Sequence, residues 1–410
     1  MSISRRDLLA LGAMLPGFAA LAHATPPRHK QSTDLPRNPR PDDEASWEVI
    51  ARQFVIDGVH LNTGTYGSCP IPVLEATIHH LRAFERMIGQ EHPDLAALHA
   101  SLEGLLNAWP GSVAIVRNTT EAMSIVAAGI ELGRGDEVLT TTHEHIGGLC
   151  PWELHQARHG SVLRKFDPPL DPANDDEIVK AWLDNITPRT RVLSISHVLF
   201  STGMIQPVAR LVREARQRGM ISVIDGAHPP GMLKIDLQAI DADYYATSPH
   251  KWLMAPKGTG LLVVRPDRVG KTWPLIGSGD WVAKNHTRFE HVGTSNESLI
   301  AGLKAAVEFH EAIGSQAVEQ RCRYLASMLF EMLDTIDGVE LVSPRSASHR
   351  SAMVSFLKRG TTAEELQARL GRERIRTRRI AEHGYEYLRL STGVHVLPAQ
   401  LQRAAELIAG

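Results

Sequence analysis

The sequence predicts an α/β fold in which a large domain with a mostly parallel sheet precedes a smaller C-terminal α/β domain. Short apolar runs alternate with helical stretches between residues 112 and 265, which is typical of a parallel sheet covered on both faces. From Ser298 onward, two long helical patterns follow one another with no strand between them. The chain has 410 residues, 43% hydrophobic and 22% charged, which suffices for two globular domains.

The large domain is expected to span residues 46–297, with residues 46–65 packing against the small domain. Helical patterns such as residues 207–218 separate several of its strands. The strands themselves are expected in the apolar runs SVAIVRN, EVLTTT, RVLSISHV, ISVIDGAH, DYYATS and TGLLVVR.

The small domain is expected to span residues 298–410. After its two long helices come the strand patterns VELVS and SAMVSFLK. Thr362, followed three positions later by Glu365, is typical of a capped helix start, and Pro398 opens a final helix.

Residues 1–24 have the pattern of an export signal. The pair Arg5-Arg6 precedes an apolar run and the sequence AHA, and this order resembles a twin-arginine signal with its cleavage site. The apolar run is too short and too interrupted by Gly and Pro for stable membrane anchoring. We therefore expect the twin-arginine translocase to export the folded protein to the periplasm, with residues 25–45 as an exposed leader. A cytoplasmic amphipathic helix is the alternative interpretation.

Charge and cysteine content narrow the functional classes further. The formal net charge is −2 and no basic run with interleaved aromatic residues occurs, so a nucleic-acid partner is not expected. Three cysteines are too few for a disulfide framework.

Asp225 and Lys251 follow two successive strand patterns. Ligands of open α/β sheets gather at the carboxyl ends of strands, so a carboxylate and an amine placed there can face one crevice. A plain ion pair is the simplest explanation of such a pair. Pyridoxal phosphate, however, needs a lysine for its Schiff base and an acid beside its ring nitrogen.

Other segments supply the remaining needs of that cofactor. A helix N-terminus with free N–H groups can hold a phosphate, and Asn118-Thr119-Thr120 opens a helical pattern directly after a strand. His143 and His145 follow another strand, where a ring could stack on the cofactor. The two histidines could instead bind zinc, but no third ligand lies near them in the sequence, so no metal site is predicted.

Taken together, these motifs resemble the class V aminotransferase group of fold-type I pyridoxal-phosphate enzymes. The resemblance runs from HLNTGTYGSCPIPV at residues 60–73 to YLRLSTGVHV at residues 387–396. The motifs LNTGTYG and DGAHPPG are most similar to the isopenicillin-N epimerase branch of that group. The resemblance implies a fold-type I architecture, in which the mostly parallel sheet of the large domain has seven strands, and it implies pyridoxal 5'-phosphate as the cofactor.

Positions that match the family's motifs take the family's roles by implication. Lys251 would form the Schiff base, Asp225 would face the ring nitrogen, His228 would lie near the ring's 3-hydroxyl group and His145 would stack on the ring. Lys251, Asp225 and His145 are thus the expected catalytic residues. The phosphate-side residues would be Thr119, Thr120, Ser248 and His250.

The resemblance also implies substrate and subunit contacts. Arg389, in YLRLS, matches the arginine that binds the substrate carboxylate, and Asn62, in LNTGTYG, is assigned to the substrate side as well. Gly293 and Thr294 match a segment that reaches the phosphate in the partner subunit. A homodimer with shared active sites is therefore expected.

Several positions depart from the family's patterns or leave alternatives open. The loop before Arg389 holds no cysteine, which disfavours persulfide-forming desulfuration. Phe200 occupies a position where many members have Asn. Lys257 is a rival for the Schiff base, and its place before a Gly-rich turn favours a structural role. Two further basic residues form either a second anionic subsite or a solvated turn: Arg378 and Arg379.

The expected function is chemistry at Cα of an amino acid, or of an amino-acid moiety of a secreted metabolite. It would proceed through an aldimine and a quinonoid intermediate, as epimerase or aminotransferase-type chemistry. A C–S or β-elimination lyase is an alternative. A non-catalytic binding protein with the same fold is the alternative from another class.

Overall fold

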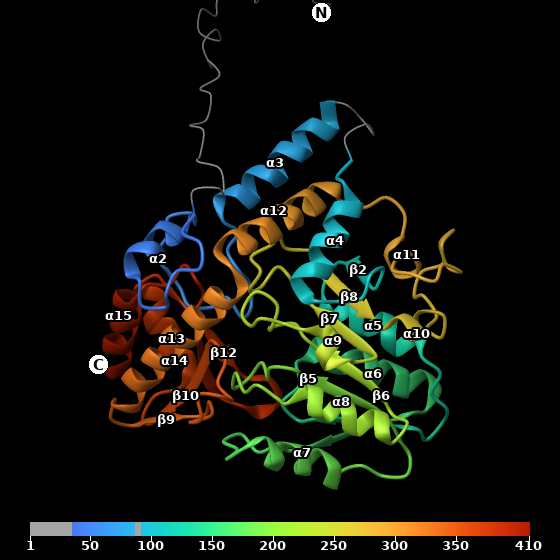
Figure 1. The fold of residues 1–410 in the computed structure, drawn as a ribbon. Helices are drawn as coiled ribbons and strands as arrows, with labels where there is room; N and C mark the ends of the chain where they lie inside the picture. Colours follow the sequence, from blue (N-terminus) through green and yellow to red (C-terminus); the bar gives the residue numbers. More distant parts are fainter. Residues whose placement is uncertain (1–34, 87–91) are drawn as a thin grey trace, which may run out of the picture. The chain divides into compact units, whose positions relative to one another are not determined.

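The computed structural model of the chain describes residues 35–86 and 92–410 (Figure 1). The predicted export signal and residues 25–34 of the predicted leader lie outside the described residues. The first helix of the described residues is α2 (Glu44–Ala51), whose N-cap is Asp43. No helix in the described part of the chain combines the length and apolar character needed to cross a bilayer.

A seven-stranded sheet forms the centre of the large domain and confirms the predicted fold class. Strand β8 runs antiparallel to both of its neighbours, whereas the other adjacent pairs are parallel. The order across the sheet is β2 (Val113–Val116), β8 (Gly260–Val264), β7 (Tyr244–Thr247), β6 (Ile221–Asp225), β5 (Thr190–Ser196), β3 (Glu137–Thr141) and β4 (Val162–Phe166).

Helices cover both faces of this sheet, because successive side chains of each buried strand point to opposite sides. Val223 of β6 packs in the apolar cluster formed with α5 (Thr119–Gly129) and Trp152 of α6 (Ile146–His159). The next residue, Ile224, packs in a second cluster on the other face. That cluster takes its helical residues from elements that include α4 (Leu95–Leu106), α7 (Asp175–Asp184), α8 (Val208–Gln217) and α9 (Leu237–Ile240).

The C-terminal part of the chain forms an antiparallel four-stranded sheet with its own apolar cluster. Thr362 and Glu365 make the reciprocal capping box that the sequence predicts. The order across the sheet is β12 (Arg378–Ile380), β13 (Tyr387–Ser391), β10 (Met353–Lys358) and β9 (Val339–Leu341). The helices packed on it are α13 (Ser315–Asp334), α14 (Ala363–Arg372) and α15 (Pro398–Ala409).

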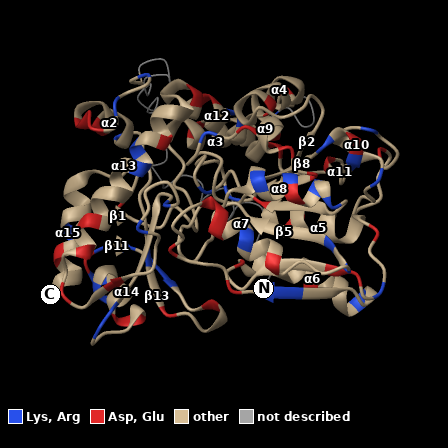
Figure 2. Ribbon diagram, turned by 60° about the horizontal axis from the view of Figure 1, so that its bottom comes forward, with Lys and Arg blue, Asp and Glu red and all other residues tan. Residues whose placement is uncertain are grey.

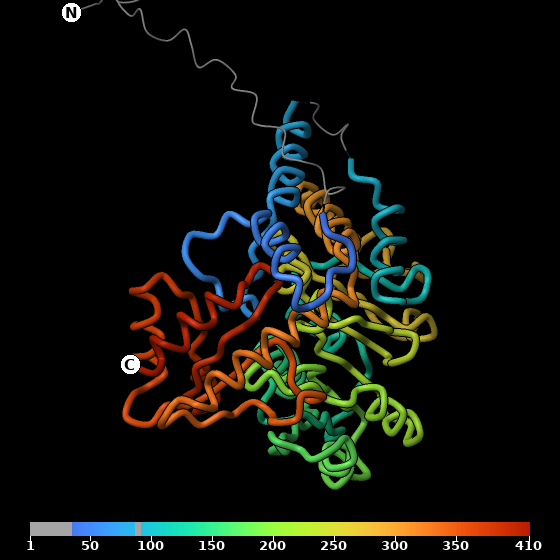
Figure 3. Tube along the Cα trace, turned by 60° about the vertical axis from the view of Figure 1, so that its left-hand side comes forward, coloured from blue at the N-terminus to red at the C-terminus, as the bar shows by residue number. Residues whose placement is uncertain are grey.

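Segments from the two ends of the described chain meet beside this sheet. Strand β1 (Val59–His60) pairs in parallel with β11 (Ile375–Arg376), and the blue and red segments lie together in Figures 1 and 3. Helix α12 (Glu297–Ile313) packs along α3 (Ile71–Arg86). Lysines and arginines are interspersed with acidic residues over the ribbon in Figure 2, in line with the near-neutral net charge.

Candidate active site

One pocket lies at the carboxyl ends of β6 and β7, where an α/β sheet is expected to bind its ligand. Its wall combines residues of the central sheet with residues from both ends of the chain, including Thr65 and Arg378. The following residues predicted for the site line it: Thr119, Thr120, His145, Asp225, His228, Ser248, His250, Lys251 and Arg389.

Asp225 ends the apolar strand β6, and its carboxylate accepts a hydrogen bond from the backbone. The N–H of Ala227 donates to Asp225 Oδ1 at 3.0 Å. Burial raises the pKa of Asp225, while the charge of Lys251 and the Ala227 hydrogen bond lower it. A Cβ on Gly148 would lie 2.9 Å from Asp225 Oδ2, so only a glycine lets the first turn of α6 approach the carboxylate this closely.

Lys251 lies in the loop that follows β7, with its amine directed into the same pocket. Its Nζ is 3.4 Å from Nε2 of His228. Burial, together with the charge of Arg389, lowers the pKa of Lys251 from 10.5 to about 8, although the charge of Asp225 acts in the opposite direction. A large fraction of the amine is therefore neutral near pH 8, as a nucleophile or a base requires.

His228 is held in one tautomer by the residue next to Lys251. The indole N–H of Trp252 donates to His228 Nδ1 at 3.1 Å. Because an indole only donates, Nδ1 must be the acceptor, and the neutral ring carries its hydrogen on Nε2. Burial, followed by the charges of Lys251, Arg389 and His145, keeps the pKa of His228 well below its usual value. The ring therefore presents a neutral N–H donor to the pocket.

The opposite end of the pocket is built to receive an anion. Helix α5 begins there, and the side chain of its N-cap Asn118 accepts from the N–H of Glu121. Ser248 Oγ accepts from the N–H of Thr119 at 3.2 Å and lies 2.7 Å from Thr119 Oγ1. A helix N-terminus with adjacent hydroxyl groups favours a phosphate. A Cβ on Gly147 would come within 2.4 Å of Thr120 Oγ1, which again requires a glycine.

His145 lies between these two ends as the N-cap of α6. Its Nδ1 accepts from the N–H of Gly147 at 3.0 Å, so the neutral ring carries its hydrogen on Nε2. Phe200 packs edge-on against the ring, with 5.2 Å between centroids. Burial and the charge of Lys251 lower the pKa of His145 to about 4. The imidazole is therefore an uncharged flat ring, and the Gly147 hydrogen bond and the Phe200 contact fix its orientation.

Arg389, on β13, is a buried cation without a carboxylate partner within ion-pair distance among residues 35–86 and 92–410. It donates from Nη1 to the carbonyl of Phe200 at 2.6 Å and from Nη2 to Thr65 Oγ1 at 3.3 Å, while Nε has no partner. Burial, reinforced by the charge of Arg378, lowers the pKa of Arg389 to about 9. Such a guanidinium favours an incoming carboxylate.

Three predicted residues do not line the pocket. Asn62, which was predicted to contact the substrate, is not a lining residue, and its Oδ1 accepts from Thr65 Oγ1 at 2.8 Å. Asn62 therefore orients the Thr65 hydroxyl group, which in turn accepts a hydrogen bond from Arg389. Gly293 and Thr294 are exposed and do not line the pocket of their own chain.

The structure gives different surroundings to the two arginines whose role the sequence left open, Arg378 and Arg379. Arg378 lines the pocket and is paired with Glu382. Arg379 is paired with Glu386 and with Glu364 and does not line the pocket.

The rival lysine and the second histidine also lie outside the pocket. Lys257 bonds to the carbonyl of Gly67, which fits a structural role. Nδ1 of His143 is 2.7 Å from Ser201 Oγ, and its ring stacks on Tyr385. Within the described residues, neither His143 nor His145 belongs to a close group of three metal-binding side chains.

Sequence reasoning missed some residues of the wall. Thr65 and Tyr66 belong to the LNTGTYG motif that was singled out, although neither was assigned a role. Trp252 stands beside Lys251 and acts through His228. It carried no recognisable signal because an indole next to a lysine is ordinary in sequence.

The donor set fits pyridoxal phosphate. Asp225 supplies an acid for a ring nitrogen, Lys251 a partly neutral amine for an aldehyde, and the start of α5 with Ser248 an anion site. His145 supplies a flat neutral surface between them. The fold and the pocket together define an α/β enzyme that uses this cofactor.

Comparison with known proteins identifies the family. The family model for aminotransferase class-V matches residues 78–391. The chain is 32% identical over 391 residues to isopenicillin N epimerase of Amycolatopsis lactamdurans, covering 88% of this chain and 98% of that protein. The chain belongs to the aminotransferase class-V family, and it is a pyridoxal-phosphate-dependent enzyme of that family.

Solved structures agree with this assignment. The cystine C–S lyase C-DES, in complex with its product cysteine persulfide, matches with a TM-score of 0.78 and 25% identity, over 86% of this chain and 97% of that one. The cysteine desulfurase CsdA of Escherichia coli matches with a TM-score of 0.79 over 88% of this chain and 97% of its own, at 23% identity, which shows the fold alone. The architecture is thus that of the fold-type I enzymes.

Proposed function

We propose that the enzyme transfers a proton at Cα of an amino acid, or of the amino-acid moiety of a larger exported metabolite. The observation that carries this proposal is Arg389, a buried guanidinium with no carboxylate partner in the described chain, on the pocket wall that also holds Lys251. Its free donors suit the α-carboxylate of a substrate. A substrate held there would present Cα to the pocket's amine.

Each residue of the pocket has a task in this proposal. Pyridoxal phosphate, when bound, supplies the electron sink that makes the Cα–H bond acidic. Asp225 would keep the ring nitrogen protonated, and the Nε2–H of His228 would donate to the ring oxygen. Lys251, neutral in large part near pH 8, would take the proton from Cα. Return of a proton from water to the opposite face, with the abstracted proton passing from Lys251 to solvent, would invert Cα, which is epimerisation.

Two outcomes compete with epimerisation. Exchange of the amino group for an oxo group is the aminotransferase outcome. Cleavage of a C–S bond or loss of a β-substituent is the lyase outcome, and the similarity to the cystine C–S lyase supports it as the second candidate. The pocket lining includes no cysteine, so a persulfide on the protein is not part of either scheme.

Incubation in deuterated water distinguishes the three reactions. The purified enzyme would be given L-amino acids, cystine and short peptides, and the products read by mass and by chirality. Deuterium at Cα with retention of nitrogen, together with inversion, supports epimerisation. An oxo acid supports transamination, and released thiol or persulfide supports the lyase. If none of the substrates exchanges its Cα hydrogen, the proposal is wrong.

Borohydride reduction tests the assignment of the lysine. We expect peptide mapping to find the pyridoxyl group on Lys251 in the wild-type enzyme and to find none in a Lys251→Ala variant. Lys257→Ala is the matched control, since Lys257 lies outside the pocket and should leave the labelling intact. A label on Lys257 in the wild type would overturn the assignment.

We further propose that the enzyme works as a periplasmic homodimer. The twin-arginine pattern of residues 1–24 supports export in the folded state, after the cofactor has been bound. The exposed Gly293 and Thr294 support a role at the partner's phosphate. Cell fractionation of the wild type and of an Arg5→Lys, Arg6→Lys variant tests the route. Light scattering and a Thr294→Ala variant, read by cofactor retention, test the shared site.

A further inference from the structure

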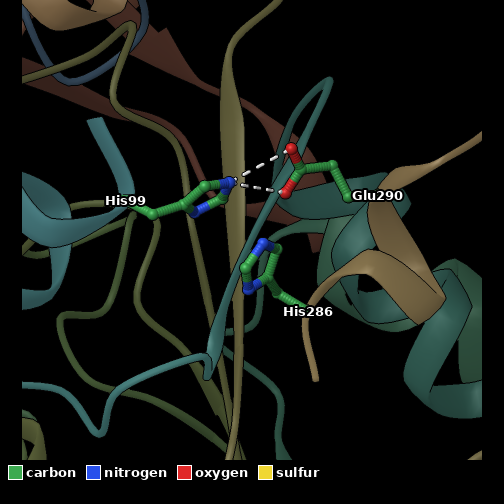
Figure 4. Close-up of side chains that lie close together, drawn as sticks. All are labelled: His99, His286 and Glu290. Carbon is green, nitrogen blue, oxygen red and sulfur yellow. Dashed lines mark hydrogen bonds and ion pairs between the residues drawn. The ribbon is translucent and has the colours of Figure 1, made fainter. Parts of the chain in front are cut away.

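A second group of ligand-type side chains lies away from the pocket. His99, on α4, meets His286 and Glu290, which lie at the two ends of the short segment that contains α11 (Thr287–Glu290) (Figure 4). One ligand atom from each of the three lies within 4.8 Å of the other two. None of these residues lines the active-site pocket, so the cofactor chemistry does not explain the cluster.

The carboxylate of Glu290 is nearly buried, with a side chain that is 11% exposed. In the described part of the chain, no lysine or arginine forms an ion pair with it. Glu290 Oε2 accepts from the N–H of Ile115, on the edge strand β2, at 3.0 Å. This hydrogen bond orients the carboxylate but does not neutralise it. A buried carboxylate needs a positive charge close by.

The two imidazoles are placed where that charge is needed. Nε2 of His99 lies 3.2 Å from both oxygens of Glu290, and its side chain is 8% exposed. The ring of His286 packs against that of His99, with 3.9 Å between centroids and 30° between planes. Each ring therefore offers a nitrogen to the space that the Glu290 carboxylate also faces.

One further atom points to a missing partner. Nδ1 of His99 is buried and has no hydrogen-bond partner. The contact with Glu290 therefore satisfies only the Nε2 atom of this ring. His286 is only half buried, which leaves the cluster open to water on one side. Two imidazoles, one carboxylate and an open position form the ligand set that zinc takes in proteins.

We propose that His99, His286 and Glu290 bind one divalent cation of the zinc class, with water as the fourth ligand. Neutral imidazoles and an ionised carboxylate leave the ion with a net charge of about +1 and remove the unpaired buried charge. Ligand atoms of a tetrahedral zinc site lie about 3.4 Å apart. The longest separation in the cluster therefore has to shorten, and a rotation of the half-buried His286 ring can provide this.

The position of the site indicates what the ion does. It joins helix α4, the edge strand β2 and the segment that leads on to Gly293 and Thr294. Residues 291–294 are exposed, and beyond Glu290 they have little apolar packing to hold them. A metal ion at Glu290 fixes the point from which this segment extends. The ion is therefore a structural clamp, and it takes no part in the chemistry of the pocket.

Cobalt titration of the untagged, chelator-treated holoenzyme tests the site. We expect one equivalent of Co²⁺ per chain, with the visible absorption of a tetrahedral N/O site, and displacement by Zn²⁺. His286→Ala and Glu290→Gln should each weaken binding by at least about tenfold. His159→Ala is the matched control, because it removes one ring of another close imidazole pair, His155 and His159, that has no carboxylate third member.

The outcomes separate this site from the proposed function. Loss of cobalt binding in His286→Ala, with the cofactor absorption unchanged, supports the clamp. If the wild-type enzyme binds no cobalt, or if His286→Ala binds as tightly as His159→Ala, the site does not exist. Should Glu290→Gln fail to fold, His286→Ala still decides, because His286 is only partly buried and its truncation disturbs the fold less.

Discussion

The indole of Trp252 donates a hydrogen bond to Nδ1 of His228, and this bond decides which nitrogen of the histidine faces the pocket. With Nδ1 occupied as an acceptor, Nε2 carries the hydrogen and points toward Lys251 at 3.4 Å. Trp252 thus acts on the pocket without lining it. It is a positioning residue.

Trp252→Phe should therefore change the chemistry more than the fold. Loss of the indole donor removes about 1 kcal/mol of hydrogen bonding and lets His228 adopt either tautomer. We expect kcat to fall about tenfold with little change in KM. The pH titration of the bound cofactor's absorption should shift as well. Trp182→Phe is the control, because that indole donates to Gln206 outside the pocket. An unchanged titration in Trp252→Phe would contradict this role.

Arg389→Lys should raise KM sharply. A lysine keeps the charge but loses the planar fork that holds a carboxylate by two hydrogen bonds. We expect KM to rise at least about tenfold, with a smaller effect on kcat, in steady-state assays. Arg379→Lys should leave both constants unchanged, since Arg379 is paired with Glu386 and Glu364 outside the pocket. Equal effects of the two variants would argue against carboxylate binding at Arg389.

Uptake of pyridoxal phosphate by the apoprotein should follow the titration of Lys251. Only the neutral amine condenses with an aldehyde, and the pKa of Lys251 is lowered to about 8. The rate should therefore rise as the pH increases through about 8 and then level off. Arg389→Met should move the midpoint upward, because the guanidinium lowers the pKa of Lys251, and Asp225→Asn should move it downward. A midpoint near 10.5 in the wild type would show an unperturbed lysine.

Glu144 makes thermal stability depend on pH. It is buried, accepts from Ser196 and Thr141, and lies near Asp225. Burial raises the pKa of Glu144 to about 7, so the folded state keeps a proton that the unfolded state releases near pH 4.5. The folded state binds more protons between these values. The stabilisation is thus complete below about pH 4.5 and is lost as the pH rises through about 7.

Glu144→Gln should accordingly raise Tm at pH 8 by about 2 °C and change it little at pH 5. Glu137→Gln is the matched control with the opposite sign. Although burial acts to raise it, the pKa of Glu137 is lowered by hydrogen bonds from Thr187, Arg189 and Arg164. Its replacement should lower Tm most at pH 8. Calorimetry at the two pH values checks both variants, and a gain for Glu137→Gln would refute the electrostatic account.

The strands of the large sheet were predictable where they are buried on both faces. Val113–Val116 and Gly260–Val264 are examples, since a continuous apolar run marks such a strand. Strand β4 was not predicted. Its residues Val162–Phe166 lie at the sheet edge and include Arg164 and Lys165, so the apolar run is broken.

The pocket was predictable for a related reason. Asp225 ends β6 and Lys251 follows β7, and these two strands are neighbours whose carboxyl ends lie at one edge of the sheet. The direction in which a side chain points was not predictable. Asn62 was placed on the substrate side, but it bonds to Thr65 and does not line the pocket. The cluster around Glu290 was not predicted, because His99 lies 191 positions earlier in the sequence and the two residues come into contact only in the folded chain.

The bond between Arg389 and Thr65 spans 324 positions of the chain. The cofactor side of the pocket comes from the middle of the sequence, from Asn118 to Lys251, and can be complete while synthesis continues. The residue that would bind a carboxylate is synthesised last, because Arg389 has to leave the ribosome before it can donate its hydrogen bond to Thr65. The residues assigned to the cofactor in one chain are therefore synthesised before the arginine assigned to the substrate.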